Sequence, residues 1–125
     1  MIHLDTNFLI GALLSGSTES TTLLDWLRRN EPATVSAIVW AEFLCGPVGA
    51  ADIATASEIF GKPVPFDGNA ATTAALLFNA GKRRRGSLAD CMIAGAALVG
   101  GGRLATNNRA DFERFQEHGL VLEVV

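Results

Sequence analysis

The sequence predicts an α/β fold of three layers, with helices on both faces of a central parallel sheet of about four to five strands. Short apolar runs of strand length alternate along the chain with longer segments that have helical periodicity. The 125 residues are 49% hydrophobic and 18% charged, which suits a compact globule that needs no disulfides to form a core. We therefore expect a single domain over residues 1–125.

In the first half of the chain, caps and helix breakers divide the apolar runs. Glu31-Pro32 ends one helix, because the residue before a proline is pushed out of the α region. Ser36 is placed to cap the next helix, and Gly46-Pro47 ends it. The expected elements here are a strand at residues 2–4, helices at 8–14 and 18–30, a strand at 33–35, helices at 37–45 and 50–60, and an extended piece at 64–66.

The second half follows the same alternation. Asp67 is the expected N-cap of an Ala- and Leu-rich helix, and three glycines end a very apolar helix at residue 99. The expected elements are helices at 67–81 and 88–99, a strand at 103–105, a short helix at 111–117 and a final strand at 120–125. Right-handed crossovers between parallel strands place their carboxyl ends along one edge of the sheet, where ligands and chemistry collect in such folds.

The composition of the chain limits the partners and the cellular compartment that we expect. The net charge of −3 gives no global attraction to a polyanion, so a contact with nucleic acid would need a local basic patch. Cys45 and Cys91 lie in apolar runs and resemble small buried hydrophobes, which suits a reducing cytosol. No uninterrupted apolar run reaches the roughly 18 residues of a membrane span. We expect a cytoplasmic protein with no membrane association.

Three carboxylates stand in segments that are otherwise apolar. Asp and Glu are rarely buried unless they are paired or bind a cation, because an isolated buried carboxylate costs several kcal/mol. Their shared explanation is that they converge on a cation that stabilises their proximity. The three residues are Asp5, Glu42 and Asp90. Each is the only acid in its segment, and the three segments are residues 1–16, 32–51 and 86–102, respectively.

Each acid also has a simpler interpretation. Asp5 precedes an apolar helix and is a standard N-cap. Asp90 stands three residues after Ser87, which matches a capping box at a helix start. Glu42 lies in the middle of a helix and could occupy its exposed edge. The three positions together favour a carboxylate cluster over three coincidences.

Carboxylates without His or Cys ligands suit hard cations such as Mg²⁺ or Mn²⁺ and not Zn²⁺. His3 lies inside the first strand and His118 near a helix end, so neither suggests a zinc site. A magnesium centre of this kind polarises a phosphodiester, generates hydroxide and stabilises the leaving oxygen.

The motifs around these acids resemble the PIN domain, in particular the VapC toxin ribonucleases of bacterial and archaeal type II toxin–antitoxin modules. The match runs nearly end to end, with the order and spacing expected for a chain of this size. The motifs are Leu4-Asp5-Thr6-Asn7, Ser36 with Ala41-Glu42, Leu88-Ala89-Asp90-Cys91-Met92-Ile93-Ala94, and Leu104-Ala105-Thr106-Asn107-Asn108 with Asp111-Phe112.

The resemblance implies an endoribonuclease that depends on Mg²⁺ or Mn²⁺, with catalytic acids from four places. Asp5, Glu42 and Asp90 match three of them, and one ion held by Asp5 and Asp90 is the simplest arrangement. Many relatives carry the fourth acid where this chain has Asn108. Asp111 could supply it, or Asn108 could act as a neutral ligand, or Asp111 could only cap a helix. The groups expected to orient carboxylates and waters are Thr6, Asn7, Ser36, Thr106 and Asn108.

A basic run, Lys82-Arg83-Arg84-Arg85, holds four of the ten Lys and Arg residues and precedes the Asp90 motif. Its simple interpretation is a solvated helix end, where cations complement the helix dipole. Its functional interpretation is a contact with the phosphate backbone of RNA, or with an acidic segment of a partner. No aromatic residue lies within the run, so it offers no platform for stacking bases.

The resemblance also implies partners. VapC-like proteins form homodimers and assemble with an antitoxin into hetero-oligomers, and the antitoxin's tail covers the acidic site. Residues 18–30 and 50–60 could form an apolar groove for such a partner, although core packing is the simpler use of their apolar side chains.

Two other functions fit the same residues less well. A non-catalytic PIN-like module that binds RNA or protein would keep the acids but stay inert for want of the fourth. A phosphatase of the haloacid dehalogenase type would use Asp5 as its nucleophile, but it would want a second acid at Asn7 and a lysine near the site. Lys82 is the only lysine in the second half of the chain, and its position is poor.

Overall fold

The computed structural model describes residues 1–123 and contains a four-stranded sheet in the order β2-β1-β3-β4. All three pairings are parallel, and Ile2 in the central strand faces Ala33 on one side and Arg103 on the other. The α/β class with a central parallel sheet, predicted from the sequence, is confirmed. The strands are β1 (Ile2–Leu4), β2 (Ala33–Thr34), β3 (Arg103–Ala105) and β4 (Val121–Leu122).

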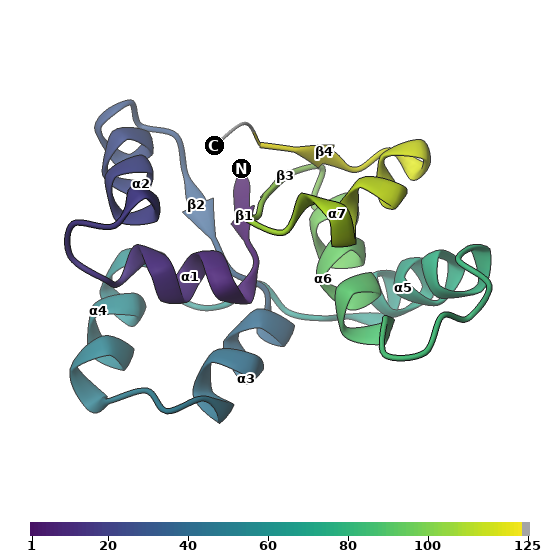
Figure 1. Ribbon diagram of the computed structural model, residues 1–125, viewed down its shortest axis with the longest axis horizontal. Helices are drawn as coiled ribbons and strands as arrows, with labels where there is room; N and C mark the ends of the chain where they lie inside the picture. The colour runs from purple at the N-terminus through teal and green to yellow at the C-terminus, as the bar shows by residue number, and fades with distance from the viewer. Residues whose placement is uncertain (124–125) are drawn as a thin grey trace.

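Helices flank this sheet on both sides. The chain moves from β1 outward to β2 and then returns past β1 to β3, so right-handed crossovers place helices on opposite faces. Figure 1 shows α1, α2 and α4 to the left of β1, α3 below it, and α5 and α6 to its right. The helices are α1 (Thr6–Ala12), α2 (Thr18–Arg28), α3 (Ala37–Cys45), α4 (Ala50–Phe60), α5 (Gly68–Ala80), α6 (Leu88–Val99) and α7 (Arg109–Phe112), followed by a 3₁₀-helix, η1 (Glu113–His118).

The core fixes these helices against the strands. On one side the ring of Phe8 stacks on Trp26, with centroids 5.6 Å apart, and joins α1 to α2. On the other side α6 packs closely against α5 at Gly95, where an added Cβ would lie 3.1 Å from the backbone nitrogen of Ala74. This tight contact holds the helix that carries Asp90 in a fixed position.

Several elements differ from the predicted bounds for local reasons. The first helix begins at Thr6 instead of Phe8, because Asp5 caps it. The second ends at Arg28, and Asn30 follows in a left-handed conformation (φ 57°) that is typical after a helix C-terminus. Leu23 and Trp26 of this helix are buried as predicted, whereas Leu24 and Leu27 are exposed.

The end of the chain also differs. The helix predicted at residues 111–117 is divided into α7 and η1, and the final strand covers Val121–Leu122. Residues 124 and 125 of the predicted strand lie outside the described residues. The extended piece at 64–66 forms only one parallel bridge, between Val64 and Ser36.

Both cysteines within residues 1–123 are free thiols; Cys91 is buried as predicted, but Cys45 is exposed at the end of α3, so that half of the prediction is wrong. None of the helices between residues 1 and 123 is both long enough and apolar enough to cross a membrane.

Candidate active site

The candidate site lies where the carboxyl ends of β1 and β3 meet. These neighbouring strands are reached by connections that run in opposite directions across the sheet, which makes the edge between them the topological switch point of the fold. Asp5 follows β1, and Thr106 follows β3. Both side chains are buried, and they come together at this point.

Asp5 is held through both carboxylate oxygens. One accepts a hydrogen bond from the backbone N–H of Phe8 (2.8 Å), which makes Asp5 the N-cap of α1. The other accepts a hydrogen bond from the hydroxyl of Thr106. The capping interpretation is therefore correct, and it leaves Asp5 at the wall of the pocket described below.

Glu42 reaches the same region from α3. Ser36 caps this helix by accepting a hydrogen bond from the N–H of Val39 (3.3 Å). Glu42 is exposed, as the simpler interpretation held, and its carboxylate accepts a hydrogen bond from the Thr6 hydroxyl (2.6 Å). The Thr6 contact ties it to the start of α1, next to Asp5.

Asp90 lies in the first turn of α6 and is half-buried. The capping-box interpretation is wrong, because the Ser87 hydroxyl donates to the carbonyl of Arg84 (2.6 Å) and caps nothing in α6. Among residues 1–123, the side chain of Asp90 makes no hydrogen bond, so its carboxylate is available to a ligand.

The turn after β3 brings the fourth acid. The Thr106 hydroxyl accepts a hydrogen bond from the backbone N–H of Asn108 (2.9 Å), and the side-chain amide of Asn108 donates to the carboxylate of Asp111 (2.5 Å). Asp111 lies inside α7, whose N-cap position is Asn108, so the interpretation of Asp111 as a helix cap is wrong. Asn107 points elsewhere and donates to Glu19 (2.5 Å).

All four acids line one polar pocket of about 170 Å³. Ser36 and Thr106 do not line it; they fix the start of α3 and the carboxylate of Asp5. Ile93 and Phe112 stand in the sequence motifs quoted above, but no role in the site was predicted for them, although Ile93 lies three residues after Asp90 on the same helix face. The lining residues are Asp5, Thr6, Asn7, Glu42, Asp90, Ile93, Asn108, Asp111 and Phe112.

The acids disfavour one another's ionisation. Burial raises the pKa of Asp5, and the charge of Glu42 adds to this effect, while the hydrogen bonds from Thr106 and Phe8 oppose it. Burial also raises the pKa of Asp90, helped by the charges of Asp111, Glu42 and Asp5 and opposed by Arg114. A cation in the pocket would remove this repulsion.

The donor set fits a magnesium-like ion better than zinc. The lining side chains that can bind a metal ion do so through oxygen, because they are carboxylates, a hydroxyl and amides, with no His or Cys among them. Within residues 1–123, no three His, Cys, Asp or Glu side chains are placed to hold an ion by themselves. That arrangement is compatible with Mg²⁺, which commonly uses one or two carboxylates and keeps several waters.

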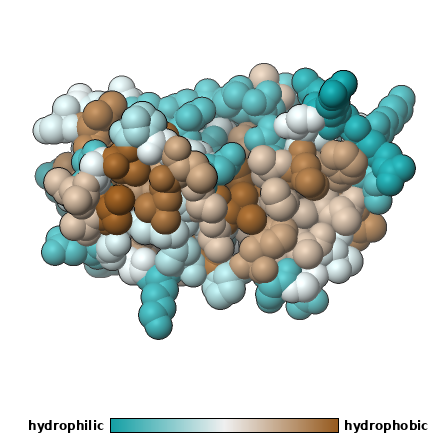
Figure 2. Space-filling model, turned by 90° about the horizontal axis from the view of Figure 1, so that it is seen from below, coloured by the Kyte–Doolittle hydropathy of each residue, from teal (hydrophilic) through white to brown (hydrophobic). Residues whose placement is uncertain are grey.

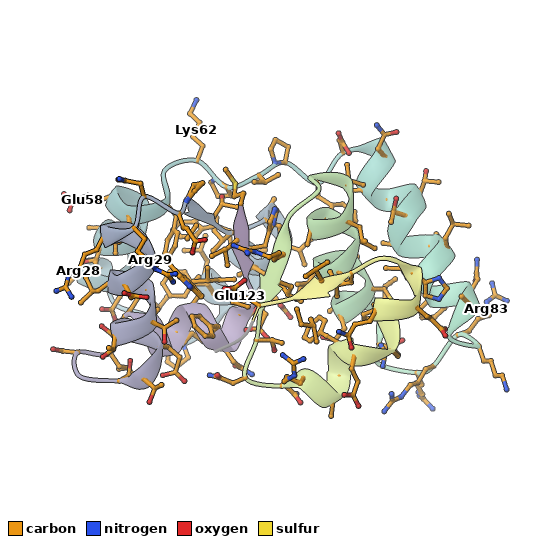
Figure 3. The ribbon with its side chains drawn as sticks, turned by 90° about the horizontal axis from the view of Figure 1, so that it is seen from above. Arg28, Arg29, Glu58, Lys62, Arg83 and Glu123 are labelled. Atoms are coloured by element: carbon orange, nitrogen blue, oxygen red, sulfur yellow. The ribbon has the colours of Figure 1, made fainter. Side chains whose placement is uncertain are left out.

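The four residues of the basic run that precedes α6 lie in two different places. Arg84 and Arg85 line a second pocket, which shares Asp90 and Asp111 with the acid pocket. Lys82 and Arg83 line neither pocket, and both have left-handed backbones, with φ of 61° and 56°. Figure 3 shows Arg83 at the far end of the molecule, directed outward.

The chain is therefore an α/β protein with a parallel sheet and a polar, acid-lined pocket at the topological switch point of that sheet. Residues 2–117 match the PIN domain family model. The chain belongs to the PIN-domain family, which confirms the resemblance seen in the sequence. No match was found among curated proteins.

Solved structures share this fold over nearly the whole chain. VapBC2 from Rickettsia felis, bound to a DNA fragment from their promoter, has a TM-score of 0.76 and 22% identity, with 98% of both chains covered. DNA-bound VapBC from Salmonella typhimurium has a TM-score of 0.74 and 21% identity, covering 98% of this chain and 96% of that chain. A toxin–antitoxin complex from Klebsiella pneumoniae has a TM-score of 0.65 and 26% identity, covering 90% of each.

Proposed function

We propose that this chain is a metal-dependent endoribonuclease and the toxin of a type II toxin–antitoxin pair. The observation that carries the proposal is the convergence of Asp5, Glu42, Asp90 and Asp111 on one pocket of a PIN-domain fold. Four carboxylates in so small a space repel one another unless a cation joins them. The solved structures with the same fold are toxin–antitoxin complexes, which supports the toxin role.

The chain's residues have distinct tasks in this proposal. Asp5 and Asp90 would hold Mg²⁺ or Mn²⁺, because Asp5 is buried at the N-cap of α1 and Asp90 is half-buried in the first turn of α6, so both are held in place. When bound, such an ion supplies charge stabilisation to a phosphodiester and makes water a better nucleophile. Glu42, positioned by Thr6, and Asp111, positioned by Asn108, would orient waters and accept a proton.

An antitoxin is the proposed partner, and an apolar groove supports this. Leu24 and Leu27, which are exposed, line a groove of about 240 Å³ between α2 and the neighbouring helices α1 and α4. A second apolar pocket of about 290 Å³ lies between α1 and α3. Figure 2 shows hydrophobic residues gathered on the side of the molecule that carries α3 and α4.

Co-purification with the product of a small adjacent reading frame tests this partner, and size-exclusion chromatography with light scattering tests the predicted homodimer.

The inert PIN-like module remains the second candidate, because Asn108 stands where many relatives carry an acid. The presence of Asp111 in the pocket, held by Asn108, favours the enzyme. The phosphatase alternative is weaker, since no lysine lines the pocket and Asn7 stands where this mechanism would want a second acid.

Cleavage of RNA by the purified protein tests the enzyme. We expect hydrolysis with Mg²⁺ or Mn²⁺ and none with EDTA, and Asp5→Asn should lower the rate about 100-fold or more, the scale on which one preorganised electrostatic group acts. Glu58→Gln is the matched control, because it removes one exposed carboxylate remote from the pocket (Figure 3). Absence of cleavage with every metal would favour the inert module, and a phospho-aspartate trapped at residue 5 would favour the phosphatase.

A further inference from the structure

A second pocket of about 160 Å³ adjoins the acid pocket and has a different character. Arginines form one of its walls, and Asp90 and Asp111 form the wall that it shares with the acid pocket. A group bound in one pocket is therefore the immediate neighbour of a group bound in the other. The lining residues are Arg84, Arg85, Gly86, Ser87, Asp90, Asp111 and Arg114.

Arg114 is fixed in place but lacks a full set of partners. Its guanidinium lies over the ring of the buried Phe115, 4.4 Å from the ring centroid, so its orientation is set by packing. Its Nη2 is buried and has no hydrogen-bond partner among residues 1–123. A buried donor without a partner is rare in folded proteins and calls for a ligand or water.

The three arginines do not neutralise the neighbouring acids by direct contact. In the described part of the chain, none of the salt bridges involves Arg84, Arg85 or Arg114, although Arg114 is near enough to oppose the rise in the pKa of Asp90. If these arginines served only to balance the charges of Asp90 and Asp111, they would be expected to form ion pairs with them, because guanidinium groups match carboxylates geometrically. These cations remain available to an anion from outside.

The amino end of α6 adds to the attraction for an anion. Gly86 and Ser87 line the pocket at this end, and the Ser87 hydroxyl donates to Arg84 instead of capping the helix. The first N–H groups of α6 therefore have no side-chain acceptor. A helix amino end with uncapped N–H groups and the positive end of the helix dipole favours phosphate.

We propose that Arg84, Arg85 and Arg114 form a subsite for one phosphate of an RNA strand, next to the phosphodiester received by the acid pocket. This inference rests on the proposed function, because it assigns the neighbouring phosphate of the same substrate. RNA fits better than an acidic peptide, because consecutive phosphates of one strand can occupy two adjoining pockets. The remaining members of the basic run, Lys82 and Arg83, lie outside the subsite.

Equilibrium binding of a short labelled single-stranded RNA tests the subsite without cleavage. Fluorescence anisotropy is measured in EDTA on the Asp5→Asn protein, with Arg84→Gln/Arg85→Gln or Arg114→Gln added. The matched control is Lys82→Gln/Arg83→Gln, which removes the same charge from the same run. Circular dichroism and thermal unfolding check the fold of each variant. Because Arg84 and Arg85 are exposed, their double variant should fold even if Arg114→Gln does not.

We expect the subsite variants to lose affinity about 10-fold or more, as charge-assisted hydrogen bonds predict, and the control to lose much less. The slope of log K against log salt should become shallower by about 0.7 for each phosphate that the variant no longer neutralises. Arg114→Lys should fall between Arg114→Gln and the parent, because it keeps the charge but not the planar fork.

Each other outcome has a definite meaning. Equal losses in the subsite and control variants would overturn the proposal in favour of general electrostatics, as would an absence of RNA binding. Unchanged RNA affinity with lost binding of a polyglutamate peptide would assign the pocket to an acidic protein partner. If the wild-type protein cleaves RNA while the subsite variants bind it normally, only the subsite fails. If they bind RNA less well but the wild-type protein never cleaves it, only the proposed function fails.

Discussion

The hydroxyl of Thr106 donates a hydrogen bond to the carboxylate of Asp5 and so joins the carboxyl ends of β3 and β1. The same oxygen accepts from the backbone N–H of Asn108 (2.9 Å). Thr106 is fully buried, so water cannot replace its hydrogen bond to the buried carboxylate of Asp5. One side chain thus links the first acid of the pocket to the turn that carries the last.

Replacing Thr106 with valine should impair both stability and activity. Valine keeps the shape but leaves the buried carboxylate oxygen of Asp5 without its partner, which costs about 1–3 kcal/mol. Urea unfolding should show the loss of stability, and RNA cleavage should fall about 10-fold or more at saturating Mg²⁺, as for other groups that orient a metal ligand. Thr106→Ser keeps the hydroxyl and should retain most of both; equal damage from Ser and Val would mean that packing of the methyl group matters more than the hydrogen bonds.

Thr6 and Glu42 allow activity to be separated from stability. The Thr6 hydroxyl donates to the exposed carboxylate of Glu42 (2.6 Å), so removing this bond leaves no buried group unpaired. Thr6→Val should change the free energy of unfolding by less than about 0.5 kcal/mol. Its cleavage rate should nevertheless fall about 10-fold, because Glu42 loses its fixed orientation. A normal rate for Thr6→Val, with a slow Glu42→Gln, would show that Glu42 acts without this partner.

The identity of the fourth acid can be decided by two single substitutions. Asp111→Asn removes a charge from the pocket, whereas Asn108→Ala removes only the amide that holds Asp111 (2.5 Å). We expect Asp111→Asn to lower the rate of RNA cleavage far more than Asn108→Ala. The reverse order would identify Asn108 as the direct participant.

The sequence was most informative where local chemistry determines structure. The bounds of α3 and α4 were predicted correctly, because Ser36 caps one helix and Gly46 and Gly61 end the two. The convergence of Asp5 with residues after β3 followed from the geometry of parallel strands. Both predictions depend on short-range signals and on one general rule of the fold.

Features set by tertiary packing escaped prediction. Strands of two or three residues carry too little pattern to give their order in the sheet. The capping-box pattern at Ser87 failed, because the preceding turn offers the Arg84 carbonyl as a competing acceptor. The left-handed backbones of Lys82 and Arg83 divided a basic run that looked uniform in the sequence. Arg114 joined the site only because the tertiary fold brings this residue of η1 to the pocket beside Asp90, far from it in the sequence.

The burial of the acids, together with their mutual repulsion, predicts how stability depends on pH. The pKa values of Asp5 and Asp90 are raised in the folded protein, so the folded state holds more protons than the unfolded state in the range between the two sets of values. Without added metal, the free energy of unfolding should therefore fall as the pH rises from about 4, the ordinary pKa of Asp, through the raised values. Below that range both states are protonated and the penalty is absent.

Asp90→Asn should relieve part of this penalty. At pH 7 in EDTA the variant should be more stable than the wild type by about 0.5 kcal/mol, a small amount because water screens a half-buried charge. The difference should vanish near pH 3, and added Mg²⁺ should raise the melting temperature of the wild type more than that of the variant. Thermal unfolding at several pH values measures all three effects, with Glu58→Gln as the control for removal of a carboxylate remote from the pocket. A variant less stable than the wild type at pH 7 in EDTA would show that Asp90 is stabilised by its surroundings, and would remove the electrostatic argument for a cation in the pocket.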